Sequence, residues 1–394
     1  MSSSKEPNGV AGRRALVVGA GLGGTTAALA LRQAGAEVAI FDKAPEFLPI
    51  GAALHLWTNA VRALQEIGVA DGLQPVSSEV RRILFTNRKG MLLADWDLDA
   101  IGRKLGAASV GIRRPELHAI LVGALAPDVV QHGREAVGFR QDATSVTVEF
   151  SDGSEERGDL LIAADGLRSA LRAHLHGPAQ PRYAGYTAWR AIVHRDFDER
   201  GSESGTFRLQ WGRGARFLFY RIGGERVYWE AIANAPEGQT DAPGTVKATV
   251  LERCREFLDP VQAVIEATEE ADVIRTDITD RDPLKRWGDG RVTLLGDAAH
   301  PMTHNLGQGG CQAIEDGVVL GKALARATTI ESGLRAYEAV RVKRSTRYVL
   351  RSRRIGALSK LENPLACAVR DRLLRHMLFK IGGRAQPREM AVEF

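Results

Sequence analysis

Residues 14–42 read RALVVGAGLGGTTAALALRQAGAEVAIFD, and this stretch decides the fold. The apolar run at 14–19 predicts a buried strand, residues 23–33 predict a helix that ends at Gly35, and residues 37–41 predict a second strand. The three elements make one β-α-β unit with connections of ordinary length. Such a unit is typical of an α/β domain built on a parallel sheet.

A glycine-rich turn joins the first strand to the helix. It reads Gly19-Ala20-Gly21-Leu22-Gly23-Gly24, which fits GxGxxG. The first glycine permits a tight turn, the second lets the backbone approach a pyrophosphate, and the last lets helix and strand pack closely. Asp42, followed by Lys43, ends the second strand, where a carboxylate can accept the ribose hydroxyls of an adenosine. The pattern predicts a dinucleotide site; the alternative is a glycine-rich turn in an ordinary apolar unit.

Two more strands run into glycine- and aspartate-bearing turns. Residues 159–166, DLLIAADG, end in Asp165-Gly166, and residues 291–301, RVTLLGDAAHP, bring Gly296-Asp297 to a strand end. Residues 305–311, NLGQGGC, then open a helix at Gly310, whose N-terminus offers unpaired N–H groups to an anion. Taken alone, each motif also fits an ordinary turn.

The middle of the chain has a different texture. Short alternating segments at 183–229, separated by glycine-rich turns, predict an antiparallel sheet with one face exposed to water. We therefore expect an α/β protein, with a Rossmann-like domain, an inserted and mostly antiparallel sheet domain, and C-terminal helices. The expected limits are a disordered tail at 1–12, a first domain at 13–75, 101–180 and 285–355, a second domain at 76–100 and 181–284, and a helical segment at 356–394.

Composition excludes several classes of protein. The chain has 394 residues, of which 44% are hydrophobic and 26% charged, and this excludes a disordered, collagenous or coiled-coil chain. Its three cysteines form no cluster, so we expect neither disulfides nor structural zinc, and a cytoplasmic location fits. The polar N-terminus lacks the apolar core of a secretory signal. The apolar run 15–31 is marginal for a transmembrane segment, and strand–turn–helix explains it better.

Charge is distributed unevenly. The formal net charge is +5, but residues 335–388 hold 15 Lys/Arg against 3 Asp/Glu, which is +12 and leaves −7 for the remainder. These cations are spread along helical stretches rather than packed in one run, so a solvated helical face is the simpler interpretation and a nucleic-acid partner is not expected. The alternative is a surface for an acidic cofactor, a lipid or a protein.

The three motifs, in this order, resemble those of the class A single-component flavoprotein monooxygenases, the para-hydroxybenzoate hydroxylase fold group. The resemblance covers residues 14–354 and is closest to the short salicylate, urate and 6-hydroxynicotinate hydroxylases and related epoxidases. It implies that FAD is the cofactor and that NADH or NADPH is a transient electron donor. It implies further that O₂ adds at flavin C4a, and that one oxygen passes to a small aromatic or polyketide-like substrate. No metal is needed.

The resemblance also implies roles for individual residues. Asp165 and Gly166 would lie near the pyrophosphate and the nicotinamide route, Arg114 would contact FAD, and residues 307–310 would line the isoalloxazine, whose reduced form is anionic. The expected cofactor-binding residues are Gly19, Gly21, Leu22, Gly23, Gly24, Asp42, Lys43, Gly51, Arg114, Asp165, Gly166, Gly296, Asp297, Gly307, Gln308, Gly309 and Gly310.

Four residues are candidates for the catalytic or substrate side. His55 matches an active-site histidine of a pyridine-hydroxylating relative and can titrate near neutral pH. Tyr220 matches a substrate-contacting tyrosine, and Arg190 follows Trp189 in a family motif on the substrate sheet. His304 replaces the last proline of the family pattern GDAAHPMTP, which adds a hydrogen-bond donor and acceptor. Each of His55, Tyr220 and Arg190 also fits an ordinary core or sheet position.

Other departures from the family pattern are Ala53, Thr58 and Arg221, and they fall around the expected pocket. They leave the substrate open. They also leave two alternatives to a hydroxylase or epoxidase. One is an FAD-dependent NAD(P)H oxidase without oxygen insertion, and the other is a non-catalytic flavin-binding regulator. The choice between NADH and NADPH and the oligomeric state are open as well.

Overall fold

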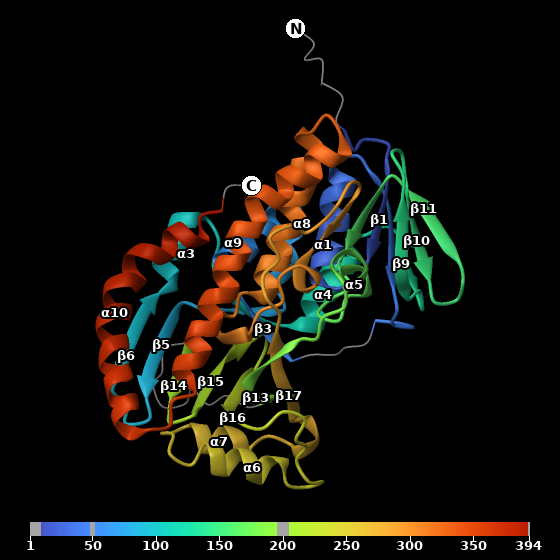
Figure 1. Cartoon of the computed structure of the whole chain (residues 1–394). Coiled ribbons are helices and arrows are strands. Elements are labelled where there is room, and N and C mark those ends of the chain that lie inside the picture. Colours follow the sequence, from blue (N-terminus) through green and yellow to red (C-terminus); the bar gives the residue numbers. More distant parts are fainter. Residues whose placement is uncertain (1–8, 48–51, 195–204, 393–394) are drawn as a thin grey trace.

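The computed structural model describes residues 9–47, 52–194 and 205–392, except for the side chains of residues 378–388. Figure 1 shows a parallel sheet at the N-terminal end of the chain, a larger sheet below it, and long C-terminal helices along one side. The described strands form four sheets. The expected α/β class with an inserted, mostly antiparallel sheet is confirmed.

The parallel sheet has the strand order β18-β12-β1-β2-β8. Its members are β18 (Val292–Leu294), β12 (Leu160–Ala163), β1 (Arg14–Val18), β2 (Glu37–Asp42) and β8 (Val130–His132). The first three are fully or almost fully buried, as expected for apolar strands covered on both faces. Helix α1 (Leu22–Gln33) follows β1 and packs against α8 (Gly309–Arg326), so the predicted β-α-β unit is present within one residue of its expected ends.

Two three-stranded sheets flank this unit. One consists of β9 (Ala136–Gln141), β10 (Val146–Phe150) and β11 (Glu155–Gly158). The other consists of β3 (Ala53–Leu56), β7 (Val110–Arg113) and β4 (Ser77–Glu79).

The short helices are α2 (Thr58–Glu66), α3 (Leu98–Leu105), α4 (Arg114–Gly123) and α5 (Ala170–His176), with 3₁₀ turns at Ala70–Leu73, Glu270–Asp272, Gly296–Ala298 and His304–Leu306.

The large sheet has seven strands in the order β17-β13-β16-β15-β14-β5-β6. They are β17 (Ile274–Asp280), β13 (Arg182–Val193), β16 (Arg226–Asn234), β15 (Ala215–Ile222), β14 (Thr206–Trp211), β5 (Arg82–Asn87) and β6 (Leu92–Asp97). All pairs are antiparallel except β14 with β5. The expectation that one face is exposed to water is wrong. One face packs against α6 (Val246–Arg253) and α7 (Val261–Glu266), and residues on the opposite face are also largely buried.

Two long helices complete the chain, α9 (Ile330–Ser359) and α10 (Pro364–Met390). A buried ion cluster fixes α9 against α8: Arg341, fully buried, donates to both Glu315 and Asp316. None of the described helices is long and apolar enough to cross a membrane.

The expectation of a disordered tail at 1–12 is wrong for residues 9–12. Val10 is completely buried and the Gly9 N–H donates to the Ala327 carbonyl at 2.9 Å, so residues 9–12 are part of the fold. Residues 1–8 lie outside the described part of the chain. The remaining domain limits stay predictions.

Candidate active site

The three motifs found in the sequence meet at one edge of the parallel sheet. Strands β1, β12 and β18 are neighbours and parallel, so their carboxyl ends lie together. The Ala164 N–H donates to the Val18 carbonyl at 2.7 Å, and the Leu295 N–H donates to the Ala163 carbonyl at 2.9 Å. In open α/β sheets, ligands bind outside the carboxyl ends of strands where the strand order reverses, and here β2 lies on one side of β1 and β12 on the other.

Backbone geometry explains two glycines of the first motif. Gly19 has φ of 103°, and a Cβ there would lie 2.3 Å from the Ala164 carbonyl oxygen. A Cβ on Gly24 would lie 1.9 Å from the Gly19 carbonyl oxygen, so the turn closes only without it. A Cβ on Gly21, by contrast, would project into open space. The turn is therefore tightly packed at Gly19 and Gly24. It is open at Gly21, next to the N-terminus of α1.

The two acidic residues nearest this turn already bind backbone groups. Asp42 accepts from the Ala20 N–H at 2.7 Å and from the Ala44 N–H at 2.8 Å. Asp165 accepts from Ser169 Oγ at 2.6 Å and from the Leu171 N–H at 3.2 Å, so it holds the start of α5. A carboxylate has further lone pairs, and both residues keep capacity for a ligand. Lys43 is exposed beside Asp42, and Gly51 lies outside the described residues.

Asp297 is the exposed residue in an otherwise buried stretch from 292 to 300. Protein atoms still surround it, and this burial raises the pKa of Asp297, while His300 and Arg114 oppose the shift. The side chain is therefore open to solvent beside the Gly296 turn, whose N–H donates to the buried Asp316 at 3.0 Å.

The loop before α8 approaches β3 and α2. Gly307 is exposed, and a Cβ on it would lie 3.2 Å from Trp57 Nε1, a buried donor that has no partner in the described structure. The side chain of Gln308 points away into a buried amide cluster with Asn59 and Gln312. Only the backbone of Gln308 is therefore available to a ligand.

Three aromatic side chains form what we call the aromatic wall: Tyr220 and Phe207 from the large sheet and His55 from β3. Tyr220 stacks on Phe207 with ring centroids 4.8 Å apart, and the His55 ring lies 5.5 Å from Phe207 and 6.0 Å from Tyr220. Burial raises the pKa of Tyr220 well above 10, so its hydroxyl stays protonated. Burial also lowers the pKa of His55 to about 3, so the expectation that His55 titrates near neutral pH is wrong for the ligand-free protein.

Charged residues share the sheet face that carries Tyr220. Strand alternation sends Trp189 and Trp229 to the α6–α7 side, and their neighbours Arg190 and Glu230, paired across β13 and β16, to the opposite side. Burial raises the pKa of Glu230, while the charges of Arg190 and Arg216 oppose the rise.

A loop residue completes this charged group, which consists of Arg190, Arg216, Glu230 and His304. His304 Nε2 lies 3.3 Å from Arg216 Nη2 and 3.8 Å from Glu230 Oε2. Buried Nε atoms of Arg190 and Arg216 and the Nε2 atom of His55 have no hydrogen-bond partner in the described structure. Such orphaned groups are expected where a ligand completes the site.

Asn305 fixes the loop that carries His304. Its side-chain oxygen accepts from Arg216, and its amide nitrogen lies 2.8 Å from the Tyr186 hydroxyl and 2.7 Å from the Ser352 carbonyl oxygen. These contacts join the loop to β15, β13 and α9. The position of His304 is thus set by three elements that are distant in sequence.

Comparison with known proteins shows the family of the chain. The FAD binding domain family matches residues 13–352. The aurachin C monooxygenase/isomerase of Stigmatella aurantiaca is 40% identical over 372 residues, which cover 93% of this chain and 94% of the relative. The FAD-dependent urate hydroxylase of Klebsiella pneumoniae is 35% identical over 343 residues, which cover 86% of this chain and 89% of the relative. The chain belongs to the class A FAD-dependent monooxygenases.

Solved structures agree with this assignment. The structure of Klebsiella pneumoniae HpxO complexed with FAD and uric acid has a TM-score of 0.88, with 32% identity and 96% of both chains covered. The monooxygenase is thus an oxidoreductase that binds FAD and hydroxylates or epoxidises a substrate, and the function predicted from the sequence is confirmed at this level.

The residues of the monooxygenase fit FAD. A Cβ on Gly21 would meet open space, Asp297 is exposed, and the buried Trp57 Nε1 has no partner in the described structure, so the site offers a ligand room and a free donor. No side chain in the described structure caps either helix, so their first N–H groups can bind the anionic parts of a ligand. The roles of individual residues toward FAD stay predictions.

Sequence reasoning missed Arg216, Glu230 and Asn305. A signal for the first two was present, because alternation in ARFLFYRI and RVYWEAIAN places Arg216 with Tyr220 and Glu230 with Tyr228. No local pattern indicates Asn305, whose partners come from distant elements.

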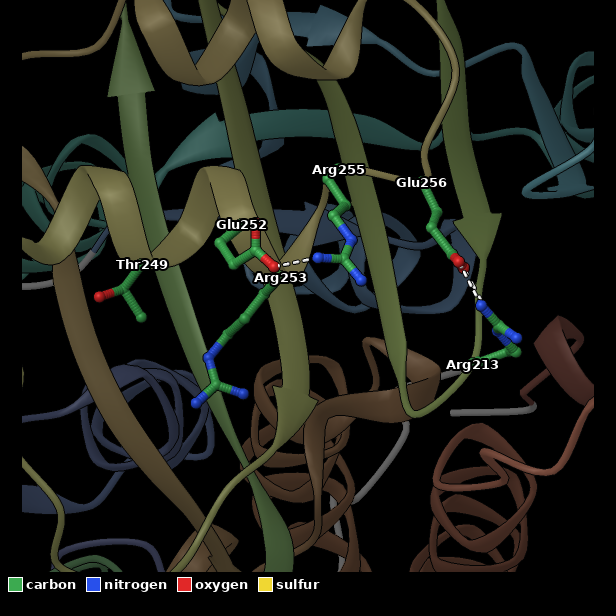
Figure 2. Close-up of a pocket in the computed structure, with 6 residues that line it drawn as sticks. All are labelled: Arg213, Thr249, Glu252, Arg253, Arg255 and Glu256. Carbon is green, nitrogen blue, oxygen red and sulfur yellow. Dashed lines mark hydrogen bonds and ion pairs between the residues drawn. The ribbon is translucent and has the colours of Figure 1, made fainter.

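A separate pocket of about 520 Å³ lies on the α6 side of the large sheet. Figure 2 shows its charged lining, in which Arg213 pairs with Glu256 and Arg255 with Glu252. None of the three motifs contributes to it. It is therefore not part of the monooxygenase site.

Proposed function

We propose that this monooxygenase inserts oxygen into a planar aromatic ring that carries hydroxyl or oxo groups. One observation carries the proposal: the group Arg190, Arg216, Glu230 and His304 lies at the same sheet face as the aromatic wall, with Arg216 and Glu230 buried and the other two half-buried. The wall suits a flat ring, and the buried polar groups require polar substituents on it. The names of two relatives, urate hydroxylase and 6-hydroxynicotinate 3-monooxygenase, belong to enzymes of such compounds.

FAD, when bound, supplies the redox chemistry, in which NADH or NADPH provides two electrons and O₂ provides one oxygen atom to the substrate and one to water. We assign the ADP part of FAD to Gly19, Gly21, Leu22, Gly23, Gly24, Asp42 and Lys43. The middle part is assigned to Arg114, Asp165, Gly166, Gly296 and Asp297, and the ring to residues 307–310. Gly51 belongs to the expected set on sequence grounds alone.

The chain's own groups orient the substrate and exclude water. Tyr220, which stays protonated, donates a hydrogen bond, and neutral His55 offers its unpartnered Nε2 atom to a second polar group of the substrate. Arg190 and Arg216 attract an oxygen substituent that is rich in electrons, while Glu230 accepts from a ring N–H or hydroxyl. Fixed dipoles and charges in a buried site act strongly because water does not screen them.

The test uses purified holoenzyme with NADH and then NADPH, alone and with a panel of hydroxy- and oxo-aromatic compounds. The proposal expects at least one compound that accelerates NAD(P)H oxidation and gives an oxygenated product. Tyr220→Phe should lower kcat/KM for that compound by about tenfold or more, because a buried hydrogen bond is lost. The control is Tyr183→Phe, a half-buried tyrosine on the same sheet whose hydroxyl donates to the Ala235 carbonyl at 2.6 Å, away from the wall. Peroxide as the only product with every compound would indicate an oxidase, and no NAD(P)H oxidation with FAD bound would indicate a regulator.

A further inference from the structure

Helix α10 has an apolar face that the rest of the described protein does not cover. Leu365, Val369, Leu373 and Met377 follow one another at intervals of four residues, so they form one stripe along the helix. Their exposed fractions are 78%, 59%, 55% and 54%. Single exposed apolar residues are common, but a continuous row of four is a sign of an interaction surface. We call these four residues the α10 stripe.

The stripe is not the face by which α10 packs on the protein. That face carries Leu374, which is buried with Leu93, Leu209 and Trp211. It also carries Asp371, which accepts from Asn87 at 2.8 Å, and Arg370, which donates to the Gly212 carbonyl at 3.0 Å. The helix is thus anchored on one side, and its second apolar side faces outward.

Cations accompany the stripe. Arg372 and Arg375 are exposed on α10, and no acidic residue is exposed between residues 363 and 377 of the described chain, whereas Glu362 is exposed just before the helix. The neighbouring α9 has the same character, since Lys343, Arg347 and Arg354 are exposed and its described residues 332–360 expose no carboxylate. The two helices are joined where Arg370 approaches the Leu358 carbonyl and Arg351 pairs with Glu389, and Figure 1 shows them on one side of the molecule.

We propose that the α10 stripe and its flanking arginines dock the enzyme on a membrane surface that contains anionic lipids. An apolar stripe bordered by cations on a helix that lies flat is the arrangement that buries side chains at the acyl boundary and pairs cations with phosphates. A second copy of the chain fits less well. In a two-fold interface the patch meets itself, and the arginines would then face arginines.

The direct test is flotation of the FAD-loaded enzyme with vesicles. One set contains phosphatidylcholine alone, and the other contains three parts phosphatidylcholine to one part phosphatidylglycerol. The wild type should bind the anionic vesicles, and added salt should weaken binding. Leu365→Ser with Leu373→Ser should lower the partition coefficient by about tenfold or more. Arg372→Glu with Arg375→Glu should remove the preference for anionic vesicles.

The matched control is Val137→Ser with Ile274→Ser, which removes two exposed apolar residues elsewhere, with exposed fractions of 50% and 44%. It should bind vesicles like the wild type, and all variants should keep their FAD. The proposal is overturned if the wild type does not float with anionic vesicles, or if the stripe variant floats equally well. It is also overturned if sedimentation shows that the wild type is a dimer and does not bind vesicles, and that Leu365→Ser with Leu373→Ser is the one variant that is a monomer. None of these readouts requires turnover, so they are independent of the proposed substrate.

Discussion

Nη2 of Arg216 lies 3.3 Å from Nε2 of His304. A guanidinium has only donors, so the His304 Nε2 atom accepts and the ring proton resides on Nδ1. Burial, together with the charges of Arg216 and Arg190, lowers the pKa of His304 well below 6.5. His304 is therefore a neutral donor at Nδ1, at the position where the family usually has a proline that can donate nothing.

The substitution His304→Pro should change turnover but not flavin binding. The 3₁₀ turn begins at His304, and the first position of a helical turn tolerates proline. Loss of the acceptor leaves buried Arg216 with one partner fewer, so we expect kcat/KM to fall about tenfold to a hundredfold and more peroxide to form. FAD content should match the wild type. Equal coupled turnover and substrate affinity in both proteins would remove His304 from the site.

Asp297→Ala should weaken retention of FAD. The carboxylate is exposed beside the Gly296 turn, and a hydrogen bond to a charged group contributes about 1.5–3 kcal/mol, so the Kd for FAD should rise about tenfold or more. The FAD-to-protein ratio after gel filtration measures this, with Asp289→Ala, an exposed aspartate that precedes β18, as the control. A fully flavinated and active Asp297→Ala enzyme would contradict the assignment.

His55 should make the apoprotein sensitive to acid. Its pKa of about 3 in the folded state lies below the ordinary 6.5, so the unfolded state binds more protons as pH falls from 6.5 toward 3 and stability is lost in that window. Between pH 7 and pH 5 this loss amounts to roughly 2 kcal/mol. Urea unfolding at the two pH values should show a smaller loss in His55→Asn. An identical pH dependence in both proteins would show that His55 is not buried in its neutral form.

Arg341→Met should destabilise the fold strongly. Although burial opposes ionisation, Arg341 and its neighbours hold the pKa of Glu315 and Asp316 below the ordinary values, so both carboxylates are charged at neutral pH. Removing the cation leaves these charges buried, which costs about 3–5 kcal/mol. Arg347→Met, on the exposed face of the same helix, is the control. The difference in the free energy of unfolding between the wild type and Arg341→Met should shrink as pH falls below about 4, because the carboxylates then take up protons. A wild-type urea midpoint for Arg341→Met would refute this.

The parallel sheet could be predicted because its signals are local. An apolar strand, a glycine turn and a helix follow one another within residues 14–33, and β12 and β18 are short apolar runs that end in Asp-Gly and Gly-Asp. Each element depends on its own residues, and the parallel arrangement then brings the three turns to one edge. Val10 was missed because its burial depends on α8 ending nearby at Arg326, far away in sequence.

The substrate side could be predicted only in part. Tyr220 and Arg190 were proposed from a family pattern, but Glu230 and Arg216 become a charged group only when β13, β16 and β15 pair in register. The water-exposed face was mispredicted because alternation reveals two faces of a strand without revealing that packed elements cover both. The low pKa of His55 also depends on tertiary burial, which a single position in a sequence does not report.

The central claim is tested most directly by turnover under ¹⁸O₂. The holoenzyme is supplied with NADH or NADPH and an accelerating hydroxy- or oxo-aromatic compound, and the product is analysed by mass spectrometry. We predict one ¹⁸O atom in the product for each NAD(P)H consumed, and loss of the label when Tyr220→Phe uncouples the reaction. An unlabelled compound recovered unchanged, with all the consumed oxygen found as peroxide, would contradict the account.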